Sequence, residues 1–207
     1  MSVSALFRRL PAGVEAIEWG RRYADDLGHA WHECKRGDWL LWLAGILEVD
    51  PKTVSLAALD CARFALSLLP EADDEERLAE VAGLVEKWVA GEAEPDELRE
   101  AAEQVLAIYH DPSRDGSQDH PFAGYATSAV ASAVLVPTYR STYGVACAAA
   151  SAGLAAAHVA GPHDETALLD AHELCARQVR ARVPFEALVA TPGFRLYARS
   201  VGEALGL

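Results

Sequence analysis

Basic residues are scarce in this sequence. Its 207 residues include 18 Lys and Arg against 31 Asp and Glu, which gives a formal net charge of −13. Binding to the phosphates of DNA or RNA requires clustered Lys and Arg, so the composition argues against a nucleic-acid-binding protein. The same excess of negative charge suits a basic protein partner, because complementary fields steer association.

Sequence signatures of catalysis and of membrane insertion are also absent. The chain has no glycine-rich phosphate loop, no Gly-x-Ser-x-Gly and no His-Glu-x-x-His pattern. Its first ten residues lack the apolar segment of a secretory signal, and no apolar run approaches the length of a membrane span. These absences predict a cytoplasmic protein that is not an enzyme and does not enter a membrane.

Cysteine is sparse, and no Cys-x-x-Cys pair occurs. We therefore expect free, buried thiols in a reducing compartment. His172 and Cys175 have i, i+3 spacing on one predicted helix, with His158 and His163 nearby. Because structural zinc needs four convergent ligands, usually in close pairs, this spacing favours a buried histidine and a core thiol. We expect neither a metal nor another cofactor.

Cys34 is the one thiol with a possible chemical role. It precedes Lys35 and Arg36, two cations that would favour a reactive thiolate. It also ends an apolar helical stripe beside Trp31, where a free cysteine is normally a packing residue. We expect a buried, unreactive thiol, and no adhesion role for the tripeptide that starts at Arg36.

Helical periodicity dominates the chain and predicts an all-α fold. We expect one domain over residues 1–207, built as a compact array of antiparallel helical hairpins with about eight to ten helices. Two sites combine a capping side chain with a first-turn proline: Asp50 before Pro51, and Thr191 before Pro192. Asp164 predicts a further helix start, and Gly91 a helix end. Alanine-rich segments over about 122–136 and 141–159 predict helices that approach one another closely.

Three of the five tryptophans lie between Trp31 and Trp42, around a short charged turn. Large aromatic side chains with a polar N–H usually mark a packing junction. We expect Gly37 to end one helix and Asp38 to cap the next. Arg63, a single charge in an apolar helix, is predicted to pair with Asp38 in a buried contact. This structural hub comprises Asp38, Trp39, Trp42, Arg63 and Trp88, with the three tryptophans largely buried.

Acidic residues gather at the ends of two predicted helices. Carboxylates stabilise helix starts, so a solvated charged rim is one interpretation. Blocks of like charge are also frequent interaction surfaces, and exposed loops often carry binding, which adds the polar loop 111–120. The residues predicted to contact a partner are Asp73, Asp74, Glu75, Glu76, Glu92, Glu94 and Glu97.

Three segments carry a resemblance to a known family. They are the run from Cys34 to Trp42, the tetrapeptide from Asp60 to Arg63, and Trp88 to Glu92 followed by Glu97-Leu98 and Ala101-Ala102. Together with the alanine-rich helices, they resemble a bacterial family of all-helical immunity proteins encoded beside polymorphic toxins. The resemblance covers residues 14 to 180 and implies that the protein binds and neutralises a toxin. It assigns no toxin-contact residues, because the shared motifs are fold determinants.

The leading hypothesis is therefore an immunity protein that blocks its cognate toxin by steric occlusion. An alternative is a small-molecule-binding or hydrolytic helical enzyme with a pocket near Trp39, Trp42, Arg63 and Asp38. A third is an accessory scaffold linked to stress or phage. A deep cleft lined by Arg63 and tryptophans would favour the enzyme, and a flat acidic face with no pocket would favour the immunity protein.

Overall fold

The computed structural model describes residues 3–4, 14–24, 26–68, 73–109, 121–139, 142–161 and 164–205. Within these ranges the regular structure is α-helical and contains no strand, so the all-α prediction is confirmed. Eleven helices are defined here, slightly more than expected, because short helices occur near both ends of the chain. They are α2 Val14–Arg21, α3 Leu27–Glu33, α4 Gly37–Ile46, α5 Pro51–Leu66, α6 Asp73–Ala90, α7 Pro95–Tyr109, α8 Pro121–Tyr139, α9 Thr142–Ala160, α10 Glu165–Arg182, α11 Phe185–Val189 and α12 Pro192–Leu205.

Three helix starts follow the predicted capping residues. The Asp50 carboxylate accepts a hydrogen bond from the Thr53 backbone N–H at 3.0 Å, directly before Pro51. The Asp164 carboxylate accepts from two backbone N–H groups at 2.9 and 3.0 Å. The Thr191 hydroxyl accepts from the Phe194 N–H at 3.1 Å. Each side chain satisfies a donor that the first turn leaves open.

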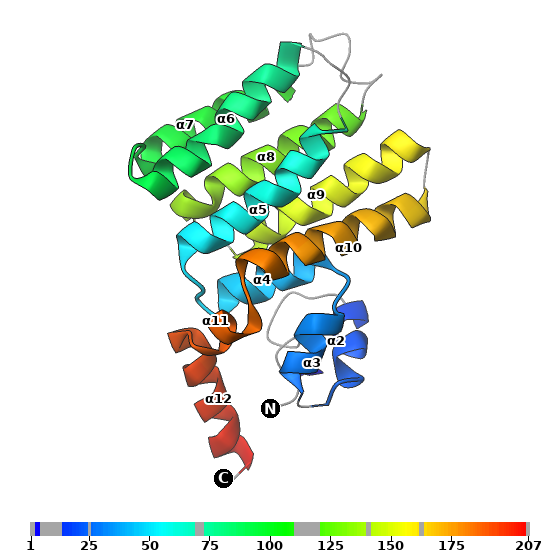
Figure 1. Ribbon diagram of the computed structural model, residues 1–207, viewed down its shortest axis with the longest axis vertical. Coiled ribbons are helices and arrows are strands. Elements are labelled where there is room, and N and C mark those ends of the chain that lie inside the picture. The colour runs from blue at the N-terminus through cyan, green and yellow to red at the C-terminus, as the bar shows by residue number, and fades with distance from the viewer. Residues whose placement is uncertain are drawn as a thin grey trace.

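Helix α9 lies at the centre of the fold. It packs against α8, α4, α10 and α5 (Figure 1). The α8–α9 contact is made by small side chains: Ala129 and Ala133 on α8 and Ala149 and Ala152 on α9 are fully buried. Because alanine adds little bulk, the two helix axes approach closely, as the sequence pattern predicts.

Two helix pairs form opposite edges of the molecule. The α6–α7 hairpin packs against α5 and α8, and its tight turn lies at the left in Figure 1. Gly91 in this turn has a φ of +81°, a conformation that favours glycine. At the other edge, α11 and α12 follow α10, and α12 extends away from the body.

The junction between α3 and α4 differs from the prediction. Gly37 does not end the preceding helix; α3 ends at Glu33, and Gly37 is the first residue of α4. A Cβ atom at Gly37 would lie 2.5 Å from the Cys175 Cβ, so glycine is required here by the close approach of α4 to α10. Asp38 therefore lies inside the first turn, and the capping position belongs to Arg36.

Candidate functional site

The Arg36–Asp38 pair organises the N-terminal junction. Arg36 donates from Nε and Nη2 to the two carboxylate oxygens of Asp38 at 2.9 and 2.7 Å. Its Nη1 lies 3.6 Å from Glu15 of α2, and its guanidinium stacks 4.7 Å from the centre of the Trp39 ring. A bidentate Arg–carboxylate pair fixes geometry as well as charge. These residues therefore fasten α2 to the start of α4.

The predicted Arg63–Asp38 pair is wrong. Arg63 instead donates to both carboxylate oxygens of Glu86 on α6, at 2.9 and 2.8 Å. This bond raises the pKa of Arg63 and lowers the pKa of Glu86. The two side chains are 44% and 52% exposed, because this face of α5 is turned toward α6 and solvent. An exposed pair contributes at most about 1 kcal/mol to stability.

The predicted burial of the tryptophans holds for one of three. Trp42 is 5% exposed and belongs to the core. Trp39 and Trp88 are only partly buried and pack against the core from its margin. Trp39 contacts Trp19 edge-on at 5.6 Å between ring centres, and Trp88 lies beneath the Lys52 ammonium at 5.7 Å. Indole rings at a margin join helices without filling the interior.

His172 is the one buried histidine near this junction. Its side chain is 7% exposed, and its Nδ1 lies 3.6 Å from an Asp38 carboxylate oxygen, beyond hydrogen-bond distance. Burial lowers the pKa of His172, while the charge of Asp38 opposes that shift. Against α9 the ring packs on Gly153, where an added Cβ would lie 3.1 Å from Nε2. The His172 ring thus packs between α9 and α10, and its burial favours the neutral form.

The thiols near the junction are packing residues. Cys34, Cys61 and Cys175 are buried and free, whereas Cys147 is partly exposed. Burial raises the pKa of the Cys34 thiol to about 12, which leaves almost no thiolate at neutral pH. The Cys61 pKa is also raised, through a hydrogen bond to Cys175 and through burial. The expectation that Cys34 is a buried packing residue is confirmed.

The histidine and cysteine pattern on α10 does not form a ligand cluster in the described residues. No group of three or more His, Cys, Asp and Glu side chains converges there as a metal site would require. His163 lies outside the described residues. Within the same ranges, no helix has both the length and the apolar character needed to cross a membrane.

Negative charge is concentrated on the α6–α7 hairpin. Residues 73–109 contain 12 Asp and Glu and 3 Lys and Arg, a net charge of −9, whereas the other 170 residues carry −4. Every acidic residue with a described side chain in the hairpin is exposed. One of these carboxylates caps the start of α7: Glu97 accepts a hydrogen bond from the Glu94 backbone N–H at 3.1 Å.

The predicted partner-contact residues all lie on this hairpin, at its two ends. Glu92, Glu94 and Glu97 surround the turn, and residues 73–76 begin α6 at the opposite end. With 18 residues in α6 and a rise of 1.5 Å per residue, the two groups are separated by about 27 Å. The side chains of Asp73, Asp74 and Glu75 are outside the description, as is the loop 111–120.

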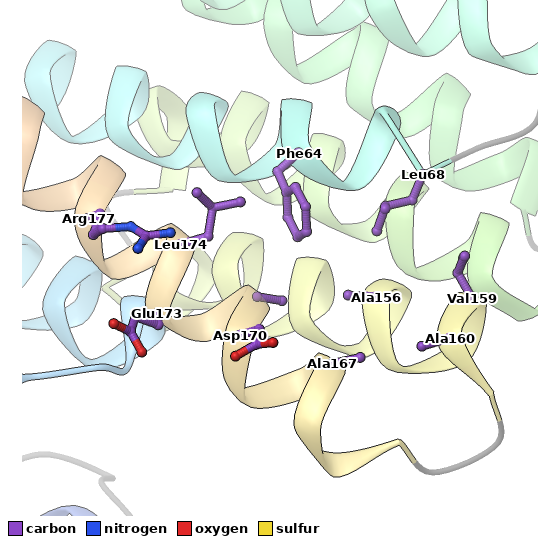
Figure 2. A pocket seen from close by; sticks show the side chains of 11 residues that line it. Phe64, Leu68, Ala156, Val159, Ala160, Ala167, Asp170, Glu173, Leu174 and Arg177 are labelled. Atoms are coloured by element: carbon purple, nitrogen blue, oxygen red, sulfur yellow. The ribbon is translucent and has the colours of Figure 1, made fainter.

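An open groove lies between α5 and α10, with α9 as its floor. Its volume is about 690 Å³. Phe64 and Leu68 reach into it from the α5 side, and Asp170, Glu173 and Arg177 line the α10 margin (Figure 2). Neither Trp39 nor Arg63 belongs to its lining, so this groove is not the pocket that the sequence suggested.

Sequence reasoning missed the groove for a physical reason. Its apolar residues have the same helical spacing as core residues, and nothing in the pattern shows where two helices diverge. Asp60 and Arg182 hold α5 and α10 together at one end through bonds of 2.7 and 3.1 Å. At the other end, the space between α5 and α10 depends on the angle between these helices, which is set by the packing of the whole array.

The chain matches no protein-family model, no curated protein and no solved structure.

Proposed function

We propose that this protein is an immunity protein that binds a toxin and neutralises it by covering the toxin's active site. The observation that carries the proposal is the concentration of net charge −9 on one helical hairpin at the edge of the molecule. The resemblance of three sequence segments to helical immunity proteins supports the same function.

The hairpin is suited to recognise a basic protein surface. Buried residues such as Val85 and Leu98 hold its inner face against the body, and its described acidic side chains are exposed on the outside. Opposite charge on a partner would accelerate association and make its rate sensitive to salt. Its length of about 27 Å is comparable with the dimensions of a standard interface, about 800 Å² per partner.

The alternative enzyme loses its main support. It required Arg63 and Asp38 to face one pocket with tryptophans, and Arg63 bonds Glu86 instead. Asp38 is engaged by Arg36, and the neighbouring thiol of Cys34 is buried. A binding protein is therefore the function that these side chains favour.

Co-expression with the product of the adjacent open reading frame tests the proposal. We expect the wild type to restore growth and a Glu76→Lys/Glu92→Lys/Glu94→Lys variant to protect at least tenfold less. The matched control, Glu18→Lys/Glu165→Lys/Glu186→Lys, makes the same charge change at exposed positions outside the hairpin. It should protect like the wild type.

Two outcomes would count against the proposal. Failure of the wild type to bind and protect would contradict the immunity function for that toxin. Equal protection by both variants, with circular dichroism showing both folded, would contradict an interface on the hairpin. In stopped-flow measurements, the association rate of the wild type should fall as salt increases, because exposed charges are screened.

A further inference from the structure

Helix α12 is the least supported long helix in the described part of the chain. Its start is anchored, since Phe194 packs against the core and Gly193 approaches the Leu47 backbone. Among the described residues, α12 otherwise contacts mainly α11, and it extends away from the body in Figure 1. Leu196 is 61% exposed, between the exposed Arg195 and Arg199.

The groove between α5 and α10 has the opposite character. Its floor is lined by small and apolar side chains of α9, including Ala156, Ala160 and the 48%-exposed Val159. Its α10 margin carries two carboxylates, Asp170 and Glu173, and the guanidinium of Arg177, all labelled in Figure 2. The molecule therefore has an open groove with two carboxylates on its margin and, in the described part of α12, exposed basic and apolar side chains.

We propose that α12 of a second copy of this chain docks in the groove. Arg195 and Arg199 are i, i+4 and lie about 6 Å apart along the helix, and Asp170 and Glu173 are i, i+3 and lie about 4.5 Å apart. The long arginine side chains can bridge that difference. Leu196 lies about 60–100° around the helix from the two arginines, so it can enter the apolar floor while they reach the margin, as an amphipathic helix does in a groove.

Two neighbouring charges define this contact further. Lys35 already lies 3.1 Å from the Glu173 carboxylate, but it is 74% exposed and such a pair is weak. Arg177 occupies the far end of the margin and repels a basic residue there, so the arginines of α12 are confined to the Asp170 end. We take the contact to be reciprocal, with α12 of each copy in the groove of the other, which gives a two-fold dimer.

The oligomeric state of the full chain tests the proposal. Light scattering after gel filtration should give twice the chain mass of 22.2 kDa at high concentration. Charge reversal by Arg195→Glu/Arg199→Glu should yield a monomer, and so should Asp170→Arg/Glu173→Arg. An equimolar mixture of the two variants should form a dimer again, because the reversed helix fits the reversed groove and the two unchanged elements fit each other.

Mixing the two variants distinguishes loss of the dimer contact from misfolding, since a misfolded variant cannot be rescued by its partner. Two matched controls, Arg21→Glu/Arg22→Glu and Glu100→Arg/Glu103→Arg, reverse exposed pairs elsewhere and should remain dimeric. A monomeric wild type, a dimer that survives both reversals, or variants that stay monomeric when mixed would each overturn the proposal. Toxin binding by a monomer would leave the proposed function intact.

Discussion

The N-terminal junction around Arg36 and Asp38, where α4 meets α10, and the α6–α7 hairpin use charged residues in opposite ways. At the junction, Asp38 is only 13% exposed and faces Arg36 and His172. On the hairpin, acidic side chains are exposed and outnumber basic ones. The junction contains the most unusual sequence segment, yet its central charges, those of Arg36 and Asp38, bind each other within the fold. The residues that are free to meet a partner come from a much plainer helical pattern.

The largest expected difference in stability between these regions comes from replacing one glycine in each region by alanine. Gly37→Ala should destabilise the protein by about 1–3 kcal/mol, because the added methyl group overlaps Cys175 where α4 meets α10. Gly83→Ala, inside α6, should stabilise it by about 0.5–1 kcal/mol, because nothing lies within 4 Å and alanine favours helix. Urea unfolding of both variants measures the difference.

Opposite signs for the two alanine variants would confirm that the junction is close-packed and the hairpin surface open. A Gly37→Ala variant as stable as the wild type would contradict the tight contact between α4 and α10. Equal destabilisation at both positions would contradict the open surroundings of Gly83.

Helix starts were predictable because they depend on neighbours in sequence. Asp50 with Pro51 and Asp164 each cap a helix through atoms two or three residues away. The packing of alanine-rich helices followed from spacing alone. The short helices near the chain ends raised the number above the predicted range, because brief segments give little periodic signal.

The ion pairs were harder to predict because they depend on which faces of distant helices meet. The sequence identified Arg63 as unusual but could not show that its partner is Glu86 on α6. Gly37 has a typical helix-end sequence, yet its role is set by Cys175, far along the chain. The acidic residues of the hairpin were identified from sequence, because exposed helix ends require no tertiary information.

The second prediction compares the two carboxylates that bind arginine. Asp38→Asn should cost about 1–2 kcal/mol, since it removes a charge-assisted pair whose side chains are 28% and 13% exposed. Glu86→Gln should cost less than about 1 kcal/mol, because its pair with Arg63 is half exposed. Thermal unfolding at low and high salt should show that salt weakens the Glu86 contribution more. Equal costs for both substitutions would contradict the difference in burial.

The smallest expected effect is a dependence of stability on pH at the junction. Burial lowers the pKa of His172 below its usual 6.5, so the folded protein binds this proton less readily than the unfolded chain does. The contribution of neutral His172 is therefore complete above pH 6.5 and is lost as the pH falls toward the lowered pKa. The urea midpoint of the wild type should fall between pH 7.5 and 5.5 by more than that of His172→Gln.

Several groups shift the pKa of His172 in opposite directions, so the measurement shows which of them dominates. Asp38 and Glu15 favour its protonation, Arg36 and burial oppose it, and α9 presents Gly153 to the ring. His29→Gln, at an exposed histidine, serves as the control and should follow the wild type at both pH values. If His172→Gln instead loses more stability than the wild type on acidification, the attraction of Asp38 exceeds the cost of burying the charge. The junction would then hold a protonated histidine, and it would differ from the hairpin only in the exposed fraction of its charged side chains.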